Sequence, residues 1–169
     1  ICAEGEEAKR RGVALCMDCR NHSMEFARAA AEVCAANGIH VRIFESLRPT
    51  PELSFAVREY DCQAGINVTA SHNPKEYNGY KVYWSDGAQL PPQHAAAIAS
   101  ELEQIDIFTG VRRMEFDDAK AQGLIEIMGA ETDERFMSHV MAMVNDRESM
   151  AKVADTFHMV YTPFHGCGW

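Results

Sequence analysis

Ser71 is the residue whose sequence surroundings point most clearly to chemistry. Ile66 and Val68 lie two positions apart, a spacing typical of one face of a buried strand. Strong turn signals follow at Asn73-Pro74 and Asn78-Gly79, so the strand ends before the serine and the chain turns back. The pattern therefore predicts a hydroxyl carried from a buried strand into a polar loop.

The same loop gathers polar side chains around that hydroxyl. His72, Asn73 and Asn78 can donate hydrogen bonds, and Lys81 adds a cation. An unassisted serine is a poor nucleophile, and a serine that carries a phosphoryl group needs its leaving charge stabilised. Hydrogen-bond donors and a cation could therefore surround any group attached to Ser71, and Lys81 is a group able to move a proton.

Strands and helices that alternate along the chain must position this loop. The elements expected before it are a strand over 12–17, a helix from its cap Ser23 to Gly38, a strand over 39–44, an extended stretch at Pro49 and Pro51, a helix over 52–62 and a strand over 66–68. Those expected after it are a strand over 81–84, helices over 92–105 and 116–121, a helix capped by Thr132 and a final strand from Phe157 to Tyr161. The other residues between 108 and 129 give no clear pattern.

This alternation predicts an α/β fold, a mixed, mainly parallel sheet with helices on both faces. In such sheets ligands bind at the carboxyl ends of the strands. Asp18 and Arg20 follow the first expected strand, and Ser71 follows the third. We therefore expect these residues to share one site.

The loop resembles the active-site serine loop of the α-D-phosphohexomutases, the phosphoglucomutase and phosphomannomutase superfamily. Its signature, Thr-Ala-Ser-His-Asn-Pro followed by Asn-Gly-x-Lys, is matched in full at residues 69–74 and 78–81. Further similarity lies at Asp18-Cys19-Arg20 with Ser23, at Pro49-Thr50-Pro51 and at Tyr161-Thr162-Pro163-Phe164-His165-Gly166. The resemblance covers nearly the whole chain, and the run from Lys81 to Gln89 is most similar to the phosphoglucomutase and phosphopentomutase branch.

The resemblance implies a phosphosugar mutase that interconverts sugar 1-phosphate and 6-phosphate, with glucose as the expected sugar. Phosphorylated Ser71 would give its phosphoryl group to the substrate and take another back, with glucose 1,6-bisphosphate as intermediate and activator. The implied catalytic residues are Ser71, Lys81 for proton transfer and His72, which orients the loop and the phosphate.

Arg20, Asn73 and Asn78 are the phosphate- or substrate-binding residues that the family resemblance suggests. Asp18 lies two residues before Arg20 and offers it a local ion pair, so a structural role for Arg20 stays open. His165 is interpreted as a folding or interdomain residue.

Magnesium is the cofactor that the resemblance implies, held by the serine phosphate and three aspartates. Ser71 would supply the phosphate ligand, but the family's Asp-Gly-Asp-x-Asp loop is absent from the sequence, as are its Gly-Leu-Arg, Gly-Glu-x-Ser and C-terminal phosphate-binding segments. We therefore expect residues 1–152 to be the first of four domains, residues 153–169 to begin the second, and these residues alone to be inactive.

Charge and hydropathy argue against two classes of partner, and a sugar phosphate is the partner that the resemblance implies. The formal net charge of −9, without a run of Lys or Arg, argues against nucleic acid or an anionic membrane surface as partner. No apolar run is as long as a membrane span, and the first residues do not resemble a signal peptide. A cytoplasmic protein is expected, and its oligomeric state stays open.

Three alternatives remain. Phosphopentomutase or phosphomannomutase activity would differ in residues that read the sugar, and a non-catalytic module would use the Ser71 loop for binding alone. A dithiol oxidoreductase would use Cys16 and Cys19, which have C-x-x-C spacing. Against it, Cys16 continues the apolar run Val13-Ala14-Leu15 and is predicted to be buried, and the six cysteines are expected to be reduced.

Overall fold

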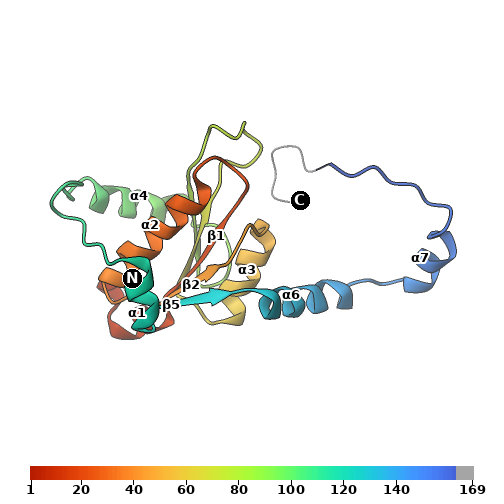
Figure 1. Ribbon diagram of the computed structural model, residues 1–169, viewed down its shortest axis with the longest axis horizontal. Coiled ribbons are helices and arrows are strands. Elements are labelled where there is room, and N and C mark those ends of the chain that lie inside the picture. Colours follow the sequence, from red (N-terminus) through yellow and green to blue (C-terminus); the bar gives the residue numbers. More distant parts are fainter. Residues whose placement is uncertain (163–169) are drawn as a thin grey trace.

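The core of the protein is a sheet with helices packed on it (Figure 1). The computed structural model describes residues 1–162. Within them the strands are β1 (Val13–Met17), β2 (Val41–Phe44), β3 (Ala64–Val68), β4 (Tyr80–Trp84) and β5 (Ile125–Met128). The helices are a 3-10 helix (Cys2–Glu4), α1 (Glu6–Arg11), α2 (Ser23–Ala36), α3 (Thr50–Glu59), α4 (Pro92–Leu102), α5 (Phe116–Ala121), α6 (Ala130–Ala142) and α7 (Arg147–Val153).

The strand order in the described part of the chain is β4-β3-β1-β2-β5. β1 pairs in parallel with β2 and β3, and β2 pairs in parallel with β5. β4 runs antiparallel to β3, because the loop between them returns the chain without a crossover helix. The predicted mixed, mainly parallel sheet is confirmed, and its antiparallel connection is the loop that carries Ser71.

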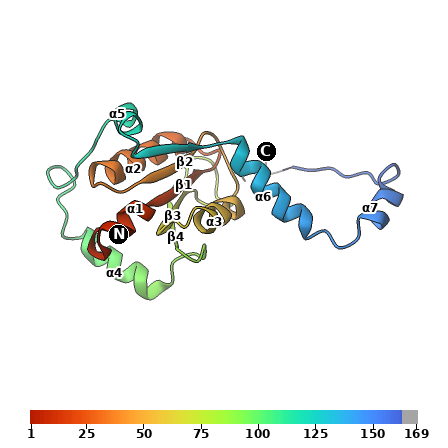
Figure 2. The ribbon, with the colours of Figure 1, turned by 90° about the horizontal axis from the view of Figure 1, so that it is seen from below.

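Both faces of β1 are buried, which explains its continuous apolar sequence. Val13, Leu15 and Met17 pack in one cluster with side chains of α2 and α5. Ala14 and Cys16 point the other way, into a cluster with α3. Figure 2 shows the sheet between these helices, so the prediction of helices on both faces is confirmed.

α3 lies especially close to β3 at Gly65. A Cβ atom placed on Gly65 would come within 2.7 Å of Val57 Cγ2 and 3.4 Å of Leu53 Cδ1, so a larger residue would push the helix away. The glycine thus sets the height of α3 over the sheet. It thereby also sets the position of Thr50, the first residue of α3.

The two predicted helix caps are wrong, because both hydroxyls bind side chains instead. α2 begins with Ser23 itself, whose Oγ donates to Asp18 Oδ1 at 3.2 Å. α6 begins two residues before Thr132, and the hydroxyls of Thr132 and Tyr60 are hydrogen-bonded at 2.6 Å. Each hydroxyl therefore links two elements.

The predicted boundaries of α3 and α4 also need correction. α3 begins at Thr50, so Pro51 lies in its first turn, where a proline leaves no helical hydrogen bond unmade. Only Pro49 is extended. Both helices end three residues earlier than expected, at Glu59 and Leu102.

Two strand predictions fail in opposite ways. β5 was not expected, since four residues at the sheet edge carry too short a pattern to recognise. A strand was expected from Phe157 to Tyr161, but no strand occurs in that part of the described chain. These residues are exposed, Val160 by 96%, and apolar alternation makes a strand only where a neighbouring strand supplies hydrogen bonds.

The last described helices extend away from the sheet. α6 leaves the end of β5 along α3, and α7 lies farther out in both views (Figures 1 and 2). No helix among residues 1–162 is long and apolar enough to cross a bilayer. The proposed boundary between residues 1–152 and 153–169 stays a prediction.

Candidate active site

Ser71 lies just beyond the carboxyl end of β3 in a strained turn. Its φ of 57° is in the left-handed region, which is uncommon for a residue with a side chain and often marks a functional site. Its backbone N–H donates to Thr69 Oγ1 at 3.1 Å. The Thr69 N–H donates to the Gly79 carbonyl at 3.0 Å, which closes the base of the loop. The serine side chain is therefore held outward, toward solvent.

Arg20 is a buried residue whose side chain anchors the backbone of this loop. Its side chain is fully buried, and its Nε donates to Asp18 Oδ2 at 2.7 Å. One terminal nitrogen donates to the carbonyls of Asn73 at 2.5 Å and Pro74 at 3.0 Å, and the other donates to the Ser71 carbonyl. With a longer hydrogen bond to the Tyr77 carbonyl at 3.4 Å, one guanidinium contacts four backbone carbonyls of the loop, using the planar geometry that arginine provides.

Asp18 connects that ion pair to β1 and β3. Its carboxylate accepts hydrogen bonds from Thr69 Oγ1 at 2.6 Å, Ser23 Oγ at 3.2 Å and the Arg20 backbone N–H at 3.2 Å. A buried carboxylate is stable only when it is paired and hydrogen-bonded, and Asp18 satisfies both conditions. The expectation that Asp18, Arg20 and Ser71 lie together is confirmed.

Asn78 ties the far end of the loop to the start of α2. Its Nδ2 donates to Ser23 Oγ at 2.9 Å and to the Asn21 carbonyl at 3.1 Å. Its Oδ1 accepts the Gly79 N–H at 2.9 Å. In this arrangement the Asn78 side chain fixes the turn that leads into β4.

Lys81 brings a cation to the serine hydroxyl. It lies in β4 directly opposite Asn67 of β3, and its Nζ donates to Ser71 Oγ. Lys81 is half-buried, whereas Ser71 is exposed, so the pair lies where the sheet meets solvent. An ammonium group on the serine oxygen can stabilise negative charge there and can deliver a proton to it.

The remaining predicted residues lie at the tip of the loop. His72 and Asn73 are both exposed, and Asn73 enters the network through its backbone, whose N–H donates to the Ala70 carbonyl at 3.1 Å. The structure thus brings Ser71, Lys81 and Arg20 together, with Arg20 holding the loop through its carbonyls. The phosphate-binding roles of Arg20, Asn73 and Asn78 stay predictions.

Two buried polar residues under the loop were missed by the sequence analysis. Thr69 links Asp18 to the Ser71 backbone, and Asn67 lies in the middle of β3 with 2% of its surface exposed. The signal was present in the sequence, because Asn67 interrupts an apolar strand between Ile66 and Val68. A polar residue at a buried strand position requires a hydrogen-bonding partner.

The magnesium site that the family resemblance implies does not form from these residues alone. Among residues 1–162 no three His, Cys, Asp or Glu side chains converge as metal ligands. A phosphate on Ser71 would add oxygen ligands, but magnesium prefers six in near-octahedral geometry.

Cys16 is a core residue, as predicted. It is fully buried, and its thiol donates to the Arg48 carbonyl at 3.0 Å. Cys19, in contrast, is exposed. A redox-active pair needs a reactive and partly exposed thiol at its attacking position, so the burial of Cys16 argues against a dithiol oxidoreductase.

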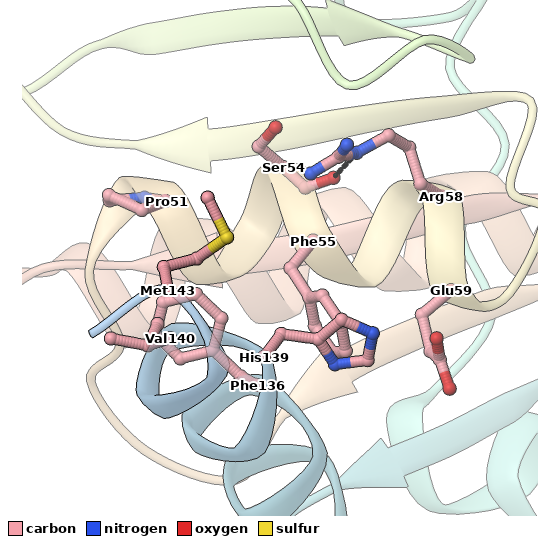
Figure 3. A pocket seen from close by; sticks show the side chains of 9 residues that line it. All are labelled: Pro51, Ser54, Phe55, Arg58, Glu59, Phe136, His139, Val140 and Met143. Atoms are coloured by element: carbon pink, nitrogen blue, oxygen red, sulfur yellow. Dashed lines mark hydrogen bonds between the residues drawn. The ribbon is translucent and has the colours of Figure 1, made fainter. Parts of the chain in front are cut away.

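A separate groove of about 470 Å³ lies between α3 and α6 (Figure 3). Its floor holds Phe55, whose ring centroid is 5.6 Å from that of Phe136 and 5.2 Å from that of His139. Arg58 and Glu59 lie on its rim. The groove residues include none of the predicted site residues.

Comparison with known proteins assigns the family. A sequence model of the phosphoglucomutase/phosphomannomutase alpha/beta/alpha domain I matches residues 2–107. The chain belongs to this family. It is 34% identical over 154 residues to a phosphoglucomutase of Staphylococcus saprophyticus, and the match covers 91% of this chain and 27% of the relative. It is 41% identical over 104 residues to human phosphopentomutase, covering 58% of this chain and 17% of that protein.

A solved structure supports the same assignment. The putative phosphomannomutase of Thermus thermophilus superposes with a TM-score of 0.64 at 26% identity, over 88% of this chain and 30% of that one. The chain therefore spans less than a third of each relative compared. Residues 163–169, including His165 of the resembled Thr-Pro-x-His-Gly segment, lie outside the described residues.

Proposed function

We propose that this domain carries the phosphoryl group of a phosphosugar mutase on Ser71. The observation that supports the proposal most strongly is the contact of Lys81 Nζ with Ser71 Oγ, on a loop whose backbone is fixed by the buried Asp18–Arg20 pair. A hydroxyl held outward beside a cation suits a group that must both leave and accept phosphate.

The proposed reaction begins with phosphorylated Ser71 and a sugar monophosphate. The bond between Ser71 Oγ and phosphorus breaks as the sugar hydroxyl oxygen bonds to phosphorus, which gives a sugar bisphosphate. Ser71 Oγ gains the proton that the sugar hydroxyl loses. Lys81 is suited to pass this proton, because its Nζ contacts Ser71 Oγ. Return of the other phosphate to Ser71 reverses each step and completes the shift between the 1- and 6-positions.

A rigid loop is useful in this reaction because phosphoryl transfer depends on positioning and on stabilisation of charge. Arg20 accounts for much of that rigidity through the backbone of Ser71, Asn73 and Pro74. In the proposed role His72, at the exposed tip, contacts the phosphate or the sugar from the solvent side.

Glucose is the proposed sugar because phosphoglucomutase relatives match most of the chain. Magnesium, when bound, would balance the phosphate charge. Residues outside this chain would supply most of its ligands and the groups that recognise the sugar. We therefore propose that the 169-residue chain by itself shows no appreciable turnover, and that the intact enzyme works in the cytoplasm.

Phosphopentomutase activity is a second candidate, favoured by the 41% identity to the human enzyme. Comparing kcat/KM for glucose 1-phosphate and ribose 1-phosphate in the intact enzyme would distinguish the two. A higher value for glucose 1-phosphate supports the first proposal, and a higher value for ribose 1-phosphate supports the second.

Transfer of labelled phosphate tests the phosphoenzyme itself. The intact enzyme is incubated with glucose 1,6-bisphosphate that carries radioactive phosphate, separated from it, and then mixed with unlabelled glucose 1-phosphate. We expect protein-bound label that moves to a sugar bisphosphate within one turnover. Label that never binds the protein, or that stays on it after the chase, would contradict the proposal.

A further inference from the structure

Asn67 is a buried residue whose side-chain amide is only partly hydrogen-bonded within the described residues. It lies in β3 with 2% of its surface exposed. Its Nδ2 donates to Thr50 Oγ1 at 2.7 Å, but its Oδ1 is buried and has no hydrogen-bond partner within the described residues. Buried acceptors are normally paired, so an unpaired one requires an explanation.

Thr50 is the hydrogen-bonding partner of this amide. Thr50 begins α3, and the close packing of that helix against Gly65 holds it over the sheet. In the structure Nδ2 is directed toward the threonine and Oδ1 points away from it. The Thr50 hydroxyl can pair with either end of an amide, but only this orientation leaves an acceptor for a neighbouring cation.

Lys81 can supply a donor, because it lies directly opposite Asn67 in the pairing of β3 with β4. Cys16, Asn67 and Lys81 form one row across β1, β3 and β4, so their side chains leave the same face of the sheet. Directly opposed residues in antiparallel strands have Cβ atoms about 4.5–5.5 Å apart. The four-carbon stem of Lys81 can span that distance, so its Nζ can reach either Ser71 Oγ or Asn67 Oδ1. The thiol of Cys16 is already directed to the Arg48 carbonyl.

We infer that Asn67 is a positioning residue for Lys81, whose ammonium it holds through Oδ1 when Nζ leaves Ser71. The inference deepens the proposed function, since esterification of Ser71 Oγ by phosphate adds bulk where Nζ now lies. Lys81 then needs a second acceptor that keeps it within reach of the phosphate, and the buried amide supplies it.

Chemical labelling of lysines in the 169-residue chain tests this contact without any turnover. The Ser71→Ala background removes the serine oxygen, which leaves Asn67 as the acceptor for Nζ. Acetylation by acetic anhydride at fixed pH is followed by mass spectrometry, with exposed Lys120 as internal reference. Only an uncharged amine reacts, so an acceptor that holds the ammonium form slows the reaction.

Two substitutions of Asn67 should change the acetylation rate of Lys81 in opposite directions. Asn67→Leu removes the acceptor and should make Lys81 react about fivefold faster, whereas Asn67→Asp supplies a charged acceptor and should slow it by a similar factor. Cys16→Ala perturbs packing in the same row but leaves Oδ1 in place, so the rate should stay within a factor of about 1.5.

Equal acetylation rates of Lys81 in all variants would overturn the inference. A change in the same direction in Asn67→Leu and Asn67→Asp would also overturn it, because a general loosening of the sheet would change both rates alike. If Asn67→Leu does not fold, the nearly isosteric Asn67→Asp decides by itself: slower labelling supports the contact, and unchanged or faster labelling contradicts it. Failure of the phosphate-transfer experiment would leave this result unaffected, so the two proposals fail separately.

In the intact enzyme the same contact predicts that substitutions of Asn67 change kcat more than KM. Asn67→Leu should lower kcat about tenfold while KM for the sugar phosphate stays within about twofold, because a misplaced Lys81 affects the chemical step. Asn67→Asp should retain more activity than Asn67→Leu. An equal loss in both variants, or a loss confined to KM, would contradict a positioning role.

Discussion

The Ser71 loop and the α3–α6 groove differ in how their polar groups are held. The groove has a volume of about 470 Å³, its floor is made of ring contacts, and Arg58 on its rim donates to the carbonyl of Ser54 at 3.3 Å (Figure 3). The loop projects outward, yet a fully buried arginine and a strained serine fix its backbone. Buried charge and backbone strain often accompany functional sites, and both occur at the Ser71 loop, so they favour the loop over the groove as the proposed reactive site.

The loop also connects to more of the fold than the groove does. Asp18 leads to β1, Thr69 to β3 and Asn78 to α2, so three elements determine the position of Ser71. The groove depends on two helices, of which α6 leaves Met143 77% exposed. Changes in the loop should therefore affect catalysis, whereas changes in the groove should not.

Substitution of the serine should have the largest effect. Ser71→Ala in the intact enzyme should reduce turnover ~10⁴-fold or more, because it removes the group that carries the phosphate. Ser54→Ala, a serine of the groove, is the matched control and should keep parental turnover. A coupled assay for glucose 6-phosphate measures both. Equal losses in the two variants would remove the distinction between loop and groove.

Lys81→Met should have the next largest effect. Loss of a proton-transfer group costs ~10²–10⁴-fold in kcat, and KM should change little because the lysine acts on Ser71 Oγ. Arg58→Met removes a cation from the groove rim and should leave both constants unchanged. Steady-state kinetics measures kcat and KM of both variants. A near-normal kcat in Lys81→Met would show that this lysine has a structural role and does not transfer the proton.

Arg20→Met should destabilise the folded chain by about 3–5 kcal/mol, because it leaves the Asp18 carboxylate buried without a cation. Arg135→Met is the control. Its ion pairs with Glu59 and Glu131 lie at the surface, where solvent screens such pairs and they contribute little to stability. Urea unfolding of the 169-residue chain compares the two. A similar loss of unfolding free energy in both variants would show that the buried Arg20 side chain does not anchor the loop.

The smallest expected effect is a pH dependence near the groove. Burial raises the pKa of Glu52 to about 7, with the Asp133 carboxylate adding to the rise and Arg48 opposing it. Because this lies above the ordinary value of 4.5, Glu52 contributes stability that is fully present below about pH 4.5 and is lost as pH rises through about 7. Asp133, whose pKa Arg48 lowers, titrates below this window.

Unfolding free energies measured at about pH 5 and pH 8 test this assignment. The parent should lose on the order of 2 kcal/mol more than Glu52→Gln over that interval, because the amide does not ionise. Parallel curves for the two proteins would show that Glu52 is not protonated in the folded state.

The fold class and the position of the Ser71 loop between two strands could be predicted because both depend on local patterns. Apolar strands, turn dipeptides and the spacing from Ser71 to Lys81 lie within short windows of sequence. The role of Arg20 could not be settled in the same way, since its partners at Asn73 and Pro74 lie more than fifty residues away.

The failed predictions share that cause. Thr132 matches a cap signal, but the neighbour that binds its hydroxyl, Tyr60, comes from another helix. Phe157–Tyr161 contains residue types common in strands, yet no strand lies beside it in the described chain. β5 is short, and its pairing with β2 supplies what its sequence lacks. Local pattern thus predicts what an element can form, and tertiary contacts decide whether it does.

Locating the phosphate tests the central claim most directly. The intact enzyme is incubated with glucose 1,6-bisphosphate and digested, and its phosphopeptides are sequenced by mass spectrometry. We expect close to one phosphate per chain, on Ser71, and none on Ser54 in the groove. A stoichiometric phosphate on any other residue would contradict the assignment of Ser71 and of the loop that holds it.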